Sequence, residues 1–164
     1  MTIDTQTLID AVQASLTADL LSPQERARLE PFDHFTTGHC AVAAEALLHL
    51  VRRYRTDLTA KPVCATYRET ATGPQPWLKG HHRPEDRRTH WYVLSSPKRA
   101  RYTWLILDPT REQYTAHGLQ PPYYLGKGRG FQGRRCAHTG LQLPTKRAAV
   151  LIDRAVAYLK ANNK

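Results

Sequence analysis

The chain has 164 residues, of which 41% are hydrophobic and 23% charged, and a formal net charge of +10 at pH 7. This length suits one domain that buries roughly two thirds of its unfolded surface, and three cysteines are too few for a disulfide framework. No apolar run approaches the ~18 residues of a membrane span, and the acidic start is unlike a signal peptide. We therefore expect a protein of a reducing compartment, the cytoplasm, with free thiols.

The first part of the chain is predicted to be helical. From residue 4 to 21, apolar side chains recur every four residues, which is typical of an amphipathic helix; they are Leu8, Val12, Leu16 and Leu20. The run Ser22-Pro23-Gln24-Glu25 predicts a capping box at the start of a second, short helix that ends near Leu29. We expect residues 1–33 to form a helical extension of the main domain.

A loop over residues 31–38 precedes a helix predicted for residues 40–54, whose apolar residues recur on one face. Cys40 begins this helix, where the helix dipole favours a thiolate. The alternative is a structural cysteine, since cysteine often packs in cores. Further along the helix, Glu45 and His49 stand four residues apart and are expected to form an exposed or half-buried pair.

Strands are predicted for residues 63–68, 90–95 and 102–108, with a long exposed loop over 69–88. The last two strands are expected to pair antiparallel. His90 opens the first of them and Asp108 ends the second, and antiparallel pairing brings such positions together. An acid there would orient the imidazole of a nucleophile–base–acid triad. The alternative is a strand-edge histidine and a turn-capping aspartate.

The last part of the chain is predicted to be irregular over residues 109–144 and helical from Thr145 onward, with Thr145 as the cap. Helices first, then strands, then a helix indicate an α+β fold. The zinc alternative, with His39 and Cys40 joined by Cys136 and His138, does not match the usual ligand spacing. We therefore expect no metal and no cofactor.

Positive charge is concentrated in the second half of the chain. Residues 79–135 carry twelve basic and four acidic side chains, a net +8, whereas residues 1–33 carry two basic and six acidic ones, a net −4. This asymmetry favours an acidic or phosphate-bearing substrate, a nucleic acid or an acidic protein partner; the alternative is a solubilising surface.

A glycine-rich run lies inside this basic half. In residues 126–130, Lys127 and Arg129 alternate with glycines, which suits either phosphate contact or a flexible loop. The aromatic neighbours of this run could stack a base or pin the loop to the core; they are Tyr123, Tyr124 and Phe131.

Three stretches, in this order, resemble the transglutaminase-like superfamily, the circularly arranged relatives of papain-like cysteine hydrolases. They are Gly38-His39-Cys40-Ala41 through Leu48, His90-Trp91-Tyr92-Val93, and Trp104 through Asp108-Pro109-Thr110. The pair Gln113-Tyr114 and the run Gly128-Arg129-Gly130-Phe131 make the pattern similar to small uncharacterised proteins of tailed bacteriophages. The resemblance covers roughly residues 38–152 and leaves residues 1–33 outside it.

The resemblance implies a papain-like fold, in which a nucleophile helix packs on an antiparallel sheet. The apolar spacing predicts the helices at both ends of the chain. The resemblance makes residues 34–164 a single compact catalytic domain with a Cys40-His90-Asp108 triad. The reaction implied is hydrolysis or acyl transfer at an amide-like bond, as in a protease, amidase or deamidase. A phage-encoded member would act on a host protein in the host cytoplasm. The rival interpretation is a non-catalytic, basic binding protein for nucleic acid or a host protein.

The family commonly supplies a side-chain donor ahead of the cysteine for the oxyanion, but no Gln or Asn stands within ten residues upstream of Cys40. His34, Thr36 and Thr37 are the candidates that remain. For substrate or anion binding we expect contributions from a further set of residues, namely Trp91, Gln113, Lys127, Arg129 and Phe131.

Overall fold

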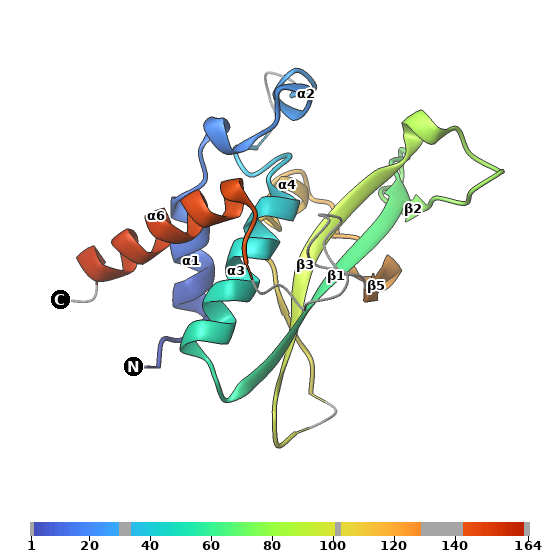
Figure 1. Ribbon diagram of the computed structural model, residues 1–164. Coiled ribbons are helices and arrows are strands. Elements are labelled where there is room, and N and C mark those ends of the chain that lie inside the picture. Colours follow the sequence, from blue (N-terminus) through green and yellow to red (C-terminus); the bar gives the residue numbers. More distant parts are fainter. Residues whose placement is uncertain (1, 30–33, 101–102, 129–142, 163–164) are drawn as a thin grey trace.

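The computed structural model describes residues 2–29, 34–100, 103–128 and 143–162. Within these ranges, five α-helices and an open, five-stranded antiparallel sheet make up an α+β fold (Figure 1). The long helices are α1 (Thr5–Ala14), α3 (Cys40–Tyr54) and α6 (Lys146–Asn162). They lie together on one side of the molecule, and α3 contacts both other helices as well as the sheet.

The sheet is built around one long hairpin. Strand β1 (Leu58–Arg68) pairs antiparallel with β3 (Arg88–Pro97), and the short β4 (Leu105–Leu107) pairs with the other edge of β3. Two further short strands, β2 (Gln75–Pro76) and β5 (Gly126–Gly128), both pair with β1. The predicted antiparallel pairing of the strands that carry His90 and precede Asp108 is therefore confirmed.

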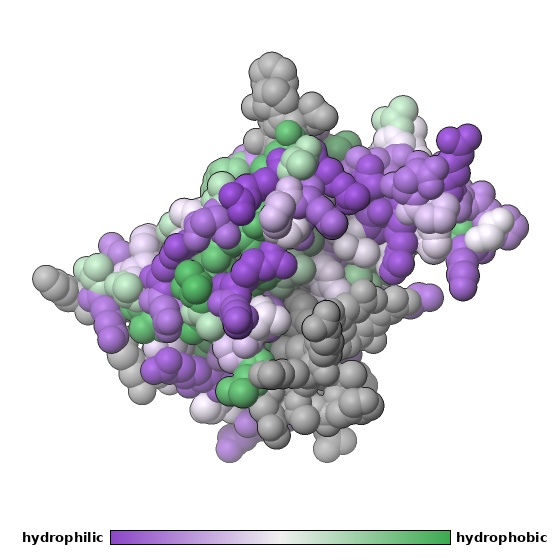
Figure 2. Space-filling model, turned by 45° about the horizontal axis from the view of Figure 1, so that its top comes forward, coloured by the Kyte–Doolittle hydropathy of each residue, from purple (hydrophilic) through white to green (hydrophobic). Residues whose placement is uncertain are grey.

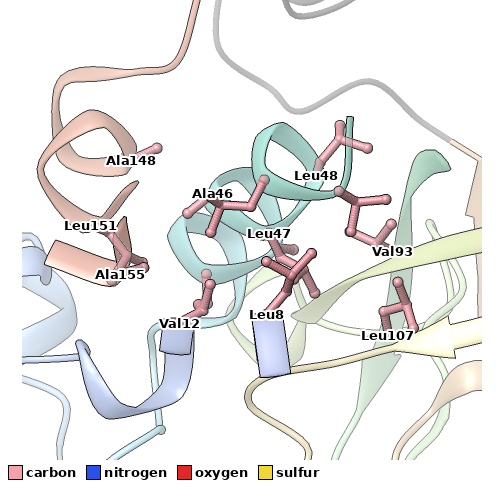
Figure 3. Packing of buried hydrophobic residues seen from close by; sticks show 14 of the residues in the cluster. Leu8, Val12, Ala46, Leu47, Leu48, Val93, Leu107, Ala148, Leu151 and Ala155 are labelled. Atoms are coloured by element: carbon pink, nitrogen blue, oxygen red, sulfur yellow. The ribbon is translucent and has the colours of Figure 1, made fainter. Parts of the chain in front are cut away.

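The core lies on both sides of α3. Figure 3 shows side chains of α3 between those of α6 and those of β3 and β4. The α3 residues Ala46, Leu47 and Leu48 are fully buried there. Leu8 and Val12 of α1 belong to the same buried cluster. The described part of residues 1–33 thus shares one core with the rest of the chain.

Local sequence signals place the helix ends. The predicted capping box is confirmed at α2 (Pro23–Arg26), where the Ser22 hydroxyl and the Glu25 carboxylate each accept a hydrogen bond from the other residue's backbone N–H. At α6 the Thr145 hydroxyl accepts from the backbone of Ala148. The helix predicted over residues 4–21 is shorter than expected: α1 ends at Ala14, and a turn and the 3-10 helix Ala18–Leu20 follow it.

Some expectations need correction. Glu45 is buried, not exposed or half-buried, because its carboxylate accepts hydrogen bonds from the backbone and hydroxyl of Thr145 and so anchors the start of α6. The stretch predicted to be irregular contains α4 (Glu112–Thr115), the 3-10 helix Tyr123–Leu125 and β5. The loop predicted over residues 69–88 contains β2 and the 3-10 helix Pro84–Asp86.

Within the described ranges, no helix has both the length and the apolar character needed to cross a membrane.

Candidate active site

The N-terminus of α3 is held by two residues that precede it. Gly38 has a φ of +80°, which favours glycine. The ring nitrogens of His39 lie 3.1 and 3.0 Å from the carbonyl oxygens of Thr37 and Thr17. Among the described residues, no side chain caps the helix with a hydrogen bond, and its first turn contains no acid. The first N–H groups of α3 and the positive end of its dipole can therefore stabilise a negative charge beside Cys40.

Cys40 lies at the seam between α3 and β3. Its side chain is half-buried, and its sulfur is 3.7 Å from the carbonyl oxygen of Thr89. The next residue along β3 is His90, and an electrostatic interaction with Cys40 contributes to the raised pKa of its ring. The helix start thus presents a thiol to the beginning of the strand.

His90 and Asp108 form a buried pair. The ring Nε2 of His90 donates to the Oδ2 of Asp108 at 2.7 Å, and the two side chains are 0% and 1% exposed. This bond occupies Nε2, so Nδ1 is the ring nitrogen available to Cys40. An imidazole fixed in this way presents one defined nitrogen to a thiol.

The electrostatics of the pair favour the charged forms of both residues. Burial lowers the pKa of His90, but the Asp108 charge, its hydrogen bond and the interaction with Cys40 outweigh burial and raise that pKa to about 9. Burial likewise raises the pKa of Asp108, and the His90 charge with several hydrogen bonds brings it below its usual value. The pair is therefore an imidazolium and a carboxylate near neutral pH.

Asp108 is held by more than its histidine. The backbone N–H and the hydroxyl of Thr110 both donate to Oδ1, at 2.8 and 3.0 Å, in the turn that follows β4. The hydroxyl of Tyr123 donates to Oδ2 at 2.8 Å. All these donors point at one buried carboxylate, so its orientation is fixed before any substrate binds. The Asp-Pro-Thr turn is a local signal that could have identified Thr110, whereas nothing near Tyr123 in the sequence marks its role.

Aromatic rings and one amide surround His90. The Tyr114 ring packs edge-on against it, with centroids 4.9 Å apart, and the Tyr114 hydroxyl is hydrogen-bonded to that of Tyr67 at 2.7 Å. The side-chain nitrogen of Gln113 lies 3.3 Å from Nδ1 of His90 and donates to the carbonyl of Thr110. Sequence reasoning missed Tyr67 and gave Tyr114 no role in the site, because the two tyrosines meet only through the fold.

A pocket of about 270 Å³ opens beside this cluster. Gln113, Tyr114 and Tyr67 form part of its wall, and Thr37, from the loop before Cys40, lines it as well. Exposed Glu69 and His117 add further polar groups to the lining. The pocket therefore offers a substrate several hydrogen-bonding groups next to the imidazole.

The three oxyanion candidates differ in their placement. Thr36 is fully buried and its hydroxyl is bonded to Nδ1 of His34 at 2.9 Å. His34 is directed to Glu112, with Nε2 3.5 Å from the carboxylate. Of the three, Thr37 lines the pocket beside the triad. Gln113, which we expected to bind substrate, has its amide nitrogen nearest to the His90 ring.

The remaining expected binding residues are separated from one another. Trp91 is buried in the hydrophobic core on β3. Lys127 is exposed on β5 and lines a second pocket. Arg129 and Phe131 lie outside the described residues, as do Cys136 and His138. Across the ranges that the structure covers, no three His, Cys, Asp or Glu side chains are grouped as metal ligands would be.

Comparison of the chain with protein-family models, with curated proteins and with solved structures finds no match.

Proposed function

We propose that this protein is a cysteine-nucleophile enzyme, a hydrolase or acyl transferase that acts on an amide-like bond, with a papain-like arrangement of helix and sheet. The observation that carries the proposal is the buried His90–Asp108 pair beside a half-buried thiol at an uncapped helix start. A thiolate is the nucleophilic form of cysteine, and both a helix N-terminus and an imidazolium stabilise it.

In the proposed reaction, the Cys40 proton resides on Nδ1 of the His90 imidazolium, and the sulfur attacks as the thiolate of this ion pair. The sulfur then bonds to the substrate carbonyl carbon, whose C=O electron pair moves onto the oxygen. The backbone N–H of Cys40, which has no partner within the helix, and the Gln113 amide are suited to donate to that oxyanion. His90 returns the proton to the leaving amine as the C–N bond breaks, and an acyl-enzyme remains.

The second half of the reaction depends on the acceptor. If water attacks the thioester, His90 takes its proton, the sulfur leaves, and the enzyme is a protease, amidase or deamidase. If an amine attacks, the enzyme is a transferase. Asp108 stabilises the imidazolium in both halves of the reaction.

Thiol reactivity tests this proposal without a known substrate. In the full-length chain, Cys40 should react with iodoacetamide at least roughly tenfold faster than free cysteine at pH 7, because a helix N-terminus and an imidazolium both favour the nucleophilic thiolate. The His90→Ala variant should lose this advantage, while His81→Ala, a change at an exposed histidine of the β1–β3 connection, should keep it. Peptide mass spectrometry assigns the modified residue.

Equal reactivity of Cys40 in the wild type and in a folded His90→Ala variant would contradict the proposal. The rival, a basic protein that binds without chemistry, would then take its place.

A further inference from the structure

A second pocket, of about 380 Å³, lies on the hairpin away from the triad residues. It is lined by Cys64 and Thr66 of β1, by residues of the connection between β2 and β3, and by the 3-10 helix and β5 that follow α4. Such a volume lies in the range of small-molecule sites. We call it the hairpin groove.

The hairpin groove is positively charged. Lys79, Arg87 and Lys127 all line it and are exposed. The first two come from the connection between β2 and β3, and the third comes from β5. None of the described residues that line the groove is acidic. Within the described part of the chain, no ion pair joins any of these three cations to a carboxylate. Their charges are therefore available to an anion. In Figure 2, hydrophilic residues dominate the end of the molecule that carries the tip of the β1–β3 hairpin.

Aromatic side chains share the same groove. The guanidinium of Arg87 stands over the ring of Trp77, 5.5 Å from its centroid. The indole N–H of Trp77 donates to the carbonyl of Arg83 at 3.0 Å, which holds the ring in place. Tyr124 is 67% exposed, although its hydroxyl donates to the carbonyl of Pro74. Two anchored rings with exposed area are thus set among three cations.

This combination distinguishes between anionic ligands. An acidic peptide needs cations but gains little from flat, anchored rings, whereas a nucleotide uses both, because every base has a π-face that stacks and every phosphate pairs with lysine or arginine. The volume also fits one nucleotide unit better than a protein surface.

We propose that the hairpin groove binds a phosphorylated nucleoside, either as a free nucleotide or as one unit of a single-stranded nucleic acid. Lys79, Arg87 and Lys127 contact the phosphates, and Trp77 and Tyr124 contact the base. This site is separate from the proposed chemistry at Cys40 and does not depend on it.

Binding to the full-length Cys40→Ala variant tests the site without any turnover. The probes are ATP, adenosine and tripolyphosphate, measured by calorimetry, and a short fluorescein-labelled oligothymidylate, measured by anisotropy. ATP should bind more tightly than adenosine or tripolyphosphate, and its affinity should fall as salt rises. If ATP binds more tightly than the oligothymidylate, the ligand is a free nucleotide; the reverse order identifies a nucleic acid strand.

Matched variants locate the binding. Arg87→Gln combined with Lys127→Gln should lower the affinity for ATP roughly tenfold or more. Lys98→Gln combined with Arg99→Gln removes the same charge from the exposed β3–β4 connection and should change the affinity less than about twofold. Trp77→Leu should lower the affinity for ATP roughly tenfold without changing the affinity for tripolyphosphate. If Trp77→Leu lowers the melting temperature, the Tyr124→Leu variant is used in its place.

Three results would overturn the proposal. They are the absence of binding by both ATP and the oligothymidylate at low salt, an equal loss in the two double variants, and a short polyglutamate peptide that competes as well as ATP does.

Discussion

His90 and Asp108 are joined at 2.7 Å although eighteen residues separate them, and their side chains are 0% and 1% exposed. Because both side chains are buried, bulk water cannot solvate one partner when the other is removed. Removing one charge would leave the second buried and uncompensated, which is strongly destabilising. The pair therefore links the stability of the fold to the state of the candidate site.

The first prediction concerns pH. Because the folded-state pKa of His90 is raised to about 9, the stability it contributes is fully present below its ordinary value of 6.5 and is lost as pH rises through about 9. The Asp108→Asn variant lacks the negative charge that raises the pKa of His90, and burial then keeps the His90 imidazole neutral. The difference in free energy of unfolding between wild type and variant should shrink by on the order of 3 kcal/mol from pH 6 to pH 10.

Urea unfolding of both proteins at the two pH values measures this difference. Subtracting the free energy of unfolding of the variant from that of the wild type removes the contribution of groups that titrate alike in both proteins. A difference that stays constant or grows with pH would show that the pair is not ionised.

The second prediction concerns Gln113, and it rests on the proposed function. Alkylation of Cys40 forms no oxyanion, so Gln113→Ala should change the iodoacetamide rate less than about twofold, whereas hydrolysis of p-nitrophenyl acetate should fall roughly a hundredfold. Gln120→Ala, at an exposed glutamine that no described hydrogen bond links to His90, is the control. If both reactions fell together, Gln113 would orient His90 and would not bind the oxyanion.

The third prediction concerns Gly126 in β5. A Cβ at this position would lie 1.8 Å from the Tyr92 hydroxyl and 2.7 Å from a methyl group of Val63. Gly126→Ala should therefore lower the free energy of unfolding by about 1–3 kcal/mol. Adding Tyr92→Phe removes the nearest clashing atom and should restore part of the loss. Thermal or urea unfolding of the two single variants and the double variant measures the coupling; additive losses would argue against the close approach.

The fourth prediction concerns the anchor of α6. Glu45→Gln leaves one acceptor for the two hydrogen bonds from Thr145, so the free energy of unfolding should fall by about 1–3 kcal/mol. The iodoacetamide rate of Cys40 should stay within about twofold of wild type, since Glu45 acts on α6. Glu69→Gln, at an exposed position, should leave stability within about 0.5 kcal/mol. A loss confined to thiol reactivity would contradict this assignment.

Local interactions made part of this structure predictable. The start and end of α3, the capping box before α2 and the Thr145 cap of α6 depend on residues within four positions of one another, so their patterns can be recognised in the sequence. The proximity of His90 and Asp108 was also predictable, because antiparallel pairing of two neighbouring strands sets which ends meet.

Long-range packing decided the rest. Tyr67 meets Tyr114 across 47 positions, and the cations of the hairpin groove come from two distant segments, the β2–β3 connection and β5. Strand β5 is too short for a periodic signal and exists because it pairs with β1. The sequence by itself determined which residues could carry chemistry and where the long helices lie. Only the tertiary structure decided what surrounds them, because contacts between distant segments depend on how the whole core packs, and no local pattern encodes that packing.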